Sequence, residues 1–332
     1  MAGCRAGVWR PQPSTSTRDT LKALSCATAR WRNGQWGPGI HRGLGGIAWL
    51  AMAGPTLSHS GRAQPAGSQL SNFSKTAAHA AEIATQKVIN MNARKNFLIF
   101  GGIGGIGGAL SDVLAAQGHH VIVTTSKPEK SQQTALAKEQ VLTVDVRDHQ
   151  SIRNAIAIAG AQGLHGMAYC VGTIDIKPLA RTTAEDLRNS LEINTIGAFI
   201  AIQAAAPILA QHQGAVVLFS SVAASRGFSN HSAIGTAKAA VEGLTRSIAA
   251  ELAPKVRVNA IAPSLTDTPL AESMTKNPKM AETIGAMHPL PRLGHAMEMA
   301  KAAAFLLSDD SAWMTGEILH IDGGRSSVEK NR

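Results

Sequence analysis

The pattern of hydrophobic and polar positions changes near residue 96. From there on, short runs of Val, Ile and Leu alternate with longer stretches in which apolar residues recur every three or four positions. Such alternation is typical of a parallel sheet covered by helices on both faces. The predicted strands are 96–100, 120–125, 141–145, 166–171, 215–220, 256–262 and 317–321. The predicted helices are 105–117, 149–159, 184–212, 231–252, 270–284 and 296–307. Residues 91–332 are therefore expected to form one α/β domain around a single doubly wound, parallel, seven-stranded sheet.

Residues 1–90 lack this alternation and differ in composition. They hold ten Lys and Arg but only two acidic residues, Asp19 and Glu82. An Arg- and Ser-rich, acid-poor segment is typical of an organellar transit peptide, which would take the protein to a mitochondrial or plastid matrix. The alternative is that translation starts at Met91, five residues before the first expected strand, and that the protein is cytoplasmic. The first hypothesis treats residues 1–90 as a disordered N-terminal extension, and the second holds that they come from a misassigned start and are never made.

Charge and cysteine content narrow the expected partners. The chain has a net charge of +10, but residues 91–332 hold 22 basic and 20 acidic residues and show no basic cluster. We therefore expect no nucleic acid as a partner. The apolar run 44–53 is too short to cross a bilayer, so no membrane is expected either. The three cysteines have no paired spacing and predict neither a disulfide framework nor a metal site.

A glycine-rich string follows the first predicted strand and leads into the first predicted helix. It reads Phe97-Leu-Ile-Phe-Gly-Gly-Ile-Gly-Gly-Ile-Gly-Gly-Ala-Leu and contains Gly101, Gly105, Ile106 and Gly107. Glycines at such a turn let the backbone approach a pyrophosphate, and the N-terminus of the following helix offers free N–H groups and a partial positive charge. The string therefore predicts a dinucleotide site in a Rossmann fold.

Further motifs follow in a fixed order over residues 100–324. They are Phe100-Gly101-x-x-x-Gly105-Ile106-Gly107, Asp145-Val146, Cys170-Val171-Gly172, Asn194, Ser220-Ser221, Lys238, Pro263-Ser-Leu265-Thr-Asp-Thr268, Thr315-Gly316 and Asp322-Gly-Gly324. In order and spacing this series resembles the short-chain dehydrogenase/reductase family, with Phe100 where that family usually has Thr. The resemblance implies an oxidoreductase that binds NAD or NADP and acts on a small molecule. It also implies contacts to the cofactor from Asp145, Val146, Val171, Gly172, Asn194, Lys238, Pro263, Leu265 and Thr268.

The end of the second predicted strand bears on the choice of cofactor. Enzymes that use NAD place an Asp or Glu there to accept hydrogen bonds from the ribose hydroxyls. This chain has Thr125, Ser126 and Lys127, two hydroxyls and a cation, which suit a 2′-phosphate. We therefore expect NADP as cofactor, with NAD as the alternative if these are ordinary loop residues.

The resemblance also implies a catalytic tetrad of Asn, Ser, Tyr and Lys. Asn194, Ser221 and Lys238 match three of its members, but the tyrosine position, four residues before Lys238, is Ile234. The one tyrosine in the chain, Tyr169, falls on the fourth predicted strand, where we expect it to be a packing residue. In the family the tyrosine protonates the carbonyl oxygen, so an active enzyme would need another proton donor.

His231 is our candidate for that donor. It precedes Lys238 by seven residues, which is two helical turns, so both residues would share one helix face. The spacing equals that of Tyr and Lys in the related enoyl-acyl-carrier-protein reductases. An unperturbed histidine titrates near pH 6.5 and can donate a proton. The alternative is that His231 only stands at the start of a helix, without a chemical role.

Residues 265–295 match the position of the family's substrate lid. The lid contains three methionines that either contact an apolar substrate or pack within helices: Met274, Met280 and Met287.

By the same resemblance, the helices 184–212 and 231–252 are expected to pair with those of other subunits in a homodimer or homotetramer. The alternative to an enzyme is a binding module that holds NADP as a sensor or regulatory subunit, because Ile234 argues against standard catalysis.

Overall fold

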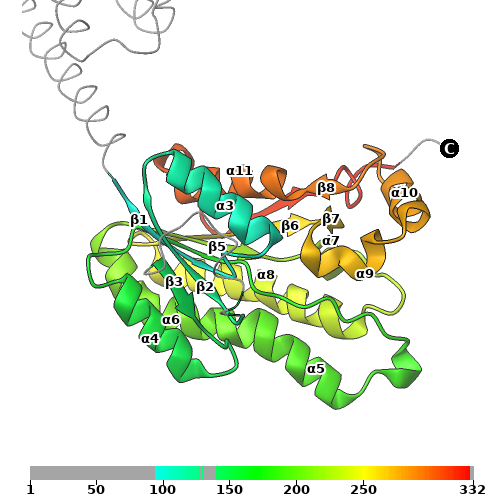
Figure 1. Cartoon of the computed structure of the whole chain (residues 1–332), viewed down its shortest axis with the longest axis horizontal. Coiled ribbons are helices and arrows are strands. Elements are labelled where there is room, and N and C mark those ends of the chain that lie inside the picture. Colours follow the sequence, from blue (N-terminus) through cyan, green and yellow to red (C-terminus); the bar gives the residue numbers. More distant parts are fainter. Residues whose placement is uncertain (1–93, 128, 130–139, 330–332) are drawn as a thin grey trace, which may run out of the picture. The chain divides into compact units, whose positions relative to one another are not determined.

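A computed structural model describes residues 94–127, 129 and 140–329 of the chain. The expectations for residues 1–90 lie outside these residues. The described part contains a seven-stranded sheet in the order β3-β2-β1-β4-β5-β6-β9, with every neighbouring pair parallel (Figure 1). Its strands are β1 (Asn96–Phe100), β2 (His120–Thr125), β3 (Val141–Thr143), β4 (Gly166–Tyr169), β5 (Ala215–Phe219), β6 (Arg257–Pro263) and β9 (Ile318–Ile321). The expected doubly wound sheet is confirmed, with each strand within two residues of its predicted ends.

Helices cover both faces of this sheet. The α-helices are α3 (Gly105–Ala116), α4 (His149–Ala159), α5 (Ala184–Leu191), α6 (Gly197–Gln211), α7 (Val222–Ser225), α8 (Ser232–Leu252), α9 (Glu272–Thr275), α10 (Pro278–Ala286) and α11 (Ala296–Leu307). Shorter elements are the 3-10 turns η4 (Leu179–Arg181), η6 (Pro269–Ala271) and η7 (Asp309–Ser311), the π-helical η5 (Glu192–Ile196), and the strands β7 (Thr266–Asp267) and β8 (Gly294–His295). Helices α3 and α11 lie on one face, and α4, α6 and α8 lie on the other (Figure 1).

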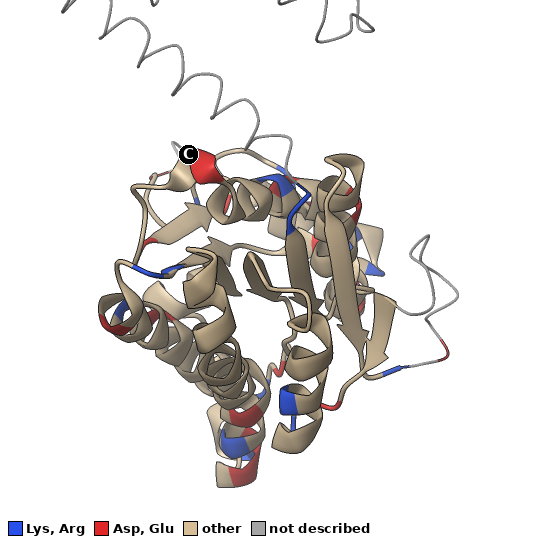
Figure 2. Cartoon of the chain, turned by 90° about the vertical axis from the view of Figure 1, so that its left-hand side faces the viewer, with Lys and Arg blue, Asp and Glu red and all other residues tan. Residues whose placement is uncertain are grey.

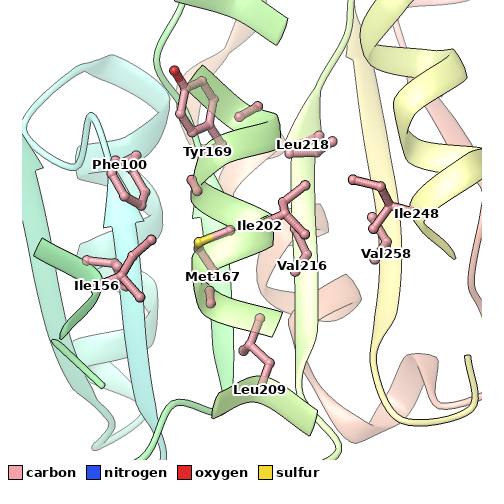
Figure 3. Packing of buried hydrophobic residues seen from close by; sticks show 14 of the residues in the cluster. Phe100, Ile156, Met167, Tyr169, Ile202, Leu209, Val216, Leu218, Ile248 and Val258 are labelled. Carbon is pink, nitrogen blue, oxygen red and sulfur yellow. The ribbon is translucent and has the colours of Figure 1, made fainter. Parts of the chain in front are cut away.

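The core consists of two apolar layers, one on each side of the sheet. Because successive side chains of a strand point to opposite faces, Phe97 and Ile99 pack toward α3 and α11, whereas Leu98 and Phe100 pack toward α4, α6 and α8. Figure 3 shows the second layer, in which Met167 and Ile202 come from a strand and a helix that face each other. Central strands buried on both faces explain the continuous apolar runs in the sequence.

The chain reverses direction across the sheet between β1 and β4. It passes from β1 to β2 and β3 on one side, then returns to β4 on the other side. In open parallel sheets such a reversal leaves a crevice at the carboxyl ends of the two strands, where ligands bind. The loops that follow β1 and β4 are therefore placed to form a site.

The structure corrects two helix predictions in the lid and near Asn194. The predicted helix 270–284 is broken into η6, α9 and α10. Pro278 has no N–H to continue a helix, and the Asn277 side chain caps α10 by accepting hydrogen bonds from the N–H groups of Lys279 and Met280. The predicted helix 184–212 is continuous, but it contains the π-helical turn η5 around Asn194.

The helical stretch Ala184–Gln211 is long and apolar enough to cross a membrane by length and composition. However, a row of its small and apolar residues is buried against the sheet: Ala198, Ala201, Ile202, Ala205 and Leu209. This burial assigns the stretch to the core of the fold. In the described residues, Lys and Arg are interspersed with Asp and Glu along the helices and loops (Figure 2).

Candidate cofactor and active site

The glycine turn lies at the carboxyl end of β1 and leads directly into α3. Gly101 has φ +73°, and its carbonyl accepts the N–H of Gly104 at 2.9 Å. A Cβ on Gly107 would lie 2.3 Å from the Gly101 oxygen, and one on Gly105 would lie 2.7 Å from the Thr268 side chain. No side chain caps α3, so its first N–H groups are left to a ligand. The turn therefore fits a dinucleotide pyrophosphate.

The end of β2 lies directly beside this turn, because the N–H of Gly102 donates to the Thr124 carbonyl at 3.1 Å. The Thr125 hydroxyl oxygen accepts the N–H of Lys127 at 3.1 Å, and the side chains of Ser126 and Lys127 are exposed. Asp145, after β3, is also exposed, and its carboxylate accepts the N–H of Arg147, a bond that lowers the pKa of Asp145. Val146 beside it is buried. The end of β2 thus offers hydroxyls and a cation, with no acid among residues 125–127.

A cavity of about 310 Å³ opens at the carboxyl ends of β4, β5 and β6. The predicted site residues that line it are Ile106, Val171, Gly172, Ser221, His231, Lys238, Pro263, Leu265 and Thr268. Met274 and Met287 of the lid line it as well, whereas Met280 is about half exposed and does not. The volume is within the usual range of small-molecule sites. Segments far apart in the sequence therefore converge on one apolar cavity.

Lys238 stands on the buried side of α8 and reaches this cavity. Its ammonium donates to the Phe219 carbonyl at 2.8 Å, and burial lowers the pKa of Lys238 to about 8. One hydrogen bond leaves two of its three N–H donors for a bound group. A Cβ on Gly172 would lie 2.8 Å from the Asn194 amide oxygen and 3.3 Å from the Lys238 nitrogen. Glycine at 172 thus keeps open the space in front of both polar groups.

Asn194 and Ser221 are held by short local contacts. Within η5, the Asn194 amide donates to the Ser190 carbonyl at 2.8 Å and accepts the N–H of Thr173 at 3.3 Å. The Ser221 oxygen accepts the N–H of Ala223 at 3.1 Å as the N-cap of α7. Because Ser221 only accepts in this bond, its hydroxyl proton remains available to an oxygen in the cavity.

Ile234 and Tyr169 occupy clearly different places. Ile234 is buried and lines the cavity beside Lys238. Tyr169 lies in the core, and its hydroxyl donates to the Ile193 carbonyl at 2.7 Å (Figure 3). Burial raises the pKa of Tyr169. A phenol already bonded in the core does not supply the missing proton to the cavity.

His231 lines the cavity, but not from the expected helix face. It precedes α8 at the N-cap position, because its φ and ψ of −106° and 17° are not helical, and its side chain caps no N–H. Its Nδ1 lies 2.7 Å from the Ser229 carbonyl, so Nδ1 carries the hydrogen and Nε2 is the second ring nitrogen. Its ring also lies 5.5 Å from that of Phe228.

A serine–histidine pair at the cavity wall gave no signal in the sequence. Ser264 lines the cavity, and its oxygen lies 2.8 Å from Nε2 of the buried His288. Nδ1 of His288 faces the carbonyls of Ile284 and Gly285, so it carries the hydrogen, and Ser264 donates to Nε2 when the ring is neutral. The two residues are 24 positions apart and meet only because the lid folds over β6.

Fold and site together define a class of protein. A parallel sheet with a glycine turn at its reversal point, next to a cavity lined by serine and lysine, is the arrangement of a dinucleotide-binding oxidoreductase. A family model described as enoyl-(acyl carrier protein) reductase matches residues 101–326. The chain belongs to the short-chain dehydrogenase/reductase family, whose members are oxidoreductases that bind NAD or NADP.

Individual relatives agree with this assignment. Carbonyl reductase family member 4 of Danio rerio is 33% identical over 234 residues, which cover 68% of this chain and 96% of the relative. The ligand-free aldohexose dehydrogenase of Thermoplasma acidophilum has 29% identity and a TM-score of 0.66, over 72% of this chain and 97% of that one. The structure of ElxO with NADP bound has 27% identity and a TM-score of 0.65, and the match covers 71% of this chain and 100% of that one.

Proposed function

We propose that the protein is an NADPH-dependent reductase of a carbonyl or a conjugated double bond, with a proton donor other than tyrosine. The observation that carries this proposal is the single cavity that brings Ser221 and Lys238 next to the loops after β4 and β6. NADPH, when bound, supplies the hydride. The residues of this chain then have to orient the cofactor and the substrate and provide the proton.

Three side chains have defined tasks in this proposal. Lys238 holds the nicotinamide ribose through its free N–H donors, and Ser221 donates a hydrogen bond from its hydroxyl to the substrate oxygen. Asn194 lies next to Lys238, in front of Gly172. The hydride adds to a carbon atom of the substrate, and the negative charge that this leaves on the carbonyl oxygen must be neutralised by a proton. General acid catalysis of that proton transfer contributes roughly 10² to 10⁴-fold. His231 is the proposed acid, because it carries a titratable ring nitrogen at the cavity wall.

The preference for NADP rests on the end of β2. Ser126 and Lys127 are exposed there and free to approach a 2′-phosphate, while an Asp or Glu that would repel it is absent from positions 125–127. A phosphate next to a lysine and two hydroxyls gains charge-assisted hydrogen bonds. NAD lacks this phosphate and would gain less at these residues.

The proposed assembly is a homodimer or homotetramer built through the helices of the α5–α6 stretch and α8. Ile196 and Phe199, both large and apolar, are 38% and 41% exposed on that stretch, which favours burial against a second subunit. A monomer in size-exclusion chromatography would contradict this proposed assembly.

We further propose that residues 1–90 are dispensable for the fold and that the protein acts in the cytoplasm, with an organellar matrix as the alternative.

The experiment that tests the function is a screen for NADPH oxidation with aldehydes, ketones, quinones and enoyl thioesters. The purified protein and its Ile234→Tyr variant are assayed side by side, because Ile234 fills the family's tyrosine position. Turnover by the wild type supports the reductase, and faster ketone reduction by the variant shows a site that lacks only its acid. The second candidate is a binding module, favoured by Ile234, and NADPH binding without turnover in either protein would support it.

A further inference from the structure

Arg325 adds a cation, apart from Lys238, to the wall of this largely apolar cavity. It follows the Asp322-Gly-Gly turn after β9 and lines the cavity together with Phe228 and Met287. One N–H of its guanidinium donates to the Met287 carbonyl at 3.0 Å, and another faces the Met287 sulfur at 3.4 Å. The guanidinium also lies 5.3 Å from the centre of the Phe228 ring. Phe228 and Met287 thus fix the position of the guanidinium.

In the described residues, no carboxylate forms an ion pair with this guanidinium. Asp322 is the one acid that acts on Arg325 electrostatically, but its two oxygens accept the N–H groups of Gly324 and Ser326 at 2.9 and 2.8 Å. Instead a second cation is close, since Arg226 donates to the backbone carbonyl of Arg325. Burial and the charge of Arg226 lower the pKa of Arg325. Two neighbouring cations without an acid partner favour binding of an anion.

The rest of the cavity selects for an apolar molecule. Its lining includes Ile174, Val222, Leu270, Met274 and Ile284 besides Ile234. A polar molecule such as a sugar would lose its hydrogen bonds to water against these side chains. The guanidinium fork, in contrast, matches a carboxylate in shape and charge.

We infer that Arg325 forms a carboxylate subsite, and that the substrate combines an apolar body with a carboxylate. This inference rests on the proposed reductase function and specifies its substrate class. The carboxylate is held by Arg325 and the apolar body fills the cavity between Phe228 and Ile234. The reacting carbonyl or double bond is then presented toward Ser221 and Lys238.

The test measures binding and does not depend on turnover. Protein saturated with NADP⁺ is titrated with 4-carboxybenzaldehyde and with its neutral counterpart, methyl 4-formylbenzoate, by calorimetry. We expect the carboxylate to bind at least about 10-fold more tightly, the effect of one charge-assisted hydrogen bond. Arg325→Gln, which keeps an N–H donor for Met287 but loses the charge, should abolish this preference and leave ester binding unchanged. Arg325→Lys should retain part of it.

The matched control is Arg188→Gln, because Arg188 is exposed and pairs with Glu185 away from the cavity. It should keep the full preference. The subsite is wrong if both probes bind the wild type equally, if neither binds, if Arg325→Gln weakens both alike, or if an equal concentration of inorganic phosphate displaces the carboxylate. Binding that depends on Arg325 without any NADPH oxidation would instead support the subsite and count against the reductase.

Discussion

Gly107 is the residue at which the proposed cofactor site can be tested most directly by a substitution. A Cβ at this position would lie 2.3 Å from the carbonyl oxygen and 2.9 Å from the carbonyl carbon of Gly101. Both atoms belong to the backbone of a turn that is fixed by the bond from the Gly104 N–H to the Gly101 oxygen. Gly107→Ala therefore requires α3 and the turn to move apart.

The size of the effect follows from this distance. A carbon and a carbonyl oxygen in contact prefer a separation of roughly 3.3 Å or more, so the displacement is about 1 Å. Overpacking of this kind typically costs about 1–3 kcal/mol. If that strain falls on the conformation that binds the pyrophosphate, the affinity for NADPH drops roughly 10- to 100-fold.

The neighbouring Gly108 provides the matched control. A Cβ there would have its nearest contact at 3.7 Å, an ordinary packing distance. Gly108→Ala should bind NADPH as the wild type does and gain up to about 1 kcal/mol of stability, because alanine favours a helix interior. Fluorescence titration with NADPH and urea unfolding measure both quantities. Equal NADPH affinities of the Gly107→Ala and Gly108→Ala variants would refute the assignment of the turn.

Three further predictions concern the cofactor, the effect of pH and the N-terminal segment. NADPH should bind several-fold more tightly than NADH, and Thr125→Asp should reverse this order, because a carboxylate repels the 2′-phosphate; equal affinities in the wild type would contradict it. Burial lowers the pKa of His119 and His165, so the folded state takes up these protons less readily than the unfolded state, and the free energy of unfolding should fall as the pH drops from about 7 to 5. His165→Gln should reduce that fall in urea titrations at both pH values, and an unchanged fall would count against it. A chain that begins at Met91 should be soluble and bind NADPH as the full chain does, whereas insolubility would show that residues 1–90 are needed.

The fold could be predicted from the sequence because its signals are local. Each strand is a short apolar run, and the glycines at 101, 105 and 107 stand at the spacing that the turn between β1 and α3 requires. The order of the family motifs also led to Asn194, Ser221 and Lys238, whose roles stay a prediction. Spacing alone did not reveal the π-helical turn at Asn194, since helices with α and π turns share nearly the same apolar pattern.

The missed residues depend on contacts between distant segments. Ser264 meets His288 only when the lid packs over β6, and Arg325 reaches the cavity only because the turn after β9 lies beside Met287. The helix prediction for 270–284 followed the apolar pattern and gave too little weight to Asn277 and Pro278. Local capping and the proline outweighed periodicity there.

His231 can be tested as the proton donor through the pH dependence of turnover. His231→Asn removes the titratable ring but keeps an N–H donor for the Ser229 carbonyl, which Nδ1 contacts at 2.7 Å. If His231 is the acid, this variant should lower kcat by roughly 10² or more and leave the NADPH dissociation constant unchanged. Stopped-flow measurement of NADPH oxidation, combined with fluorescence titration, separates the two quantities.

The pH profile distinguishes His231 from Lys238. An acid must be protonated to reduce a carbonyl, so a kcat that depends on His231 falls as rising pH removes the proton from the ring. Lys238, with its pKa lowered to about 8, loses its charge as the pH rises through about 8, and this loss should weaken NADPH binding. With rising pH the wild type should therefore show a decline in kcat that His231→Asn lacks, and a decline in NADPH affinity near pH 8 that both proteins share. A decline in kcat that persists in His231→Asn would exclude His231 and favour His288, the other imidazole linked to the cavity wall, through its contact with Ser264.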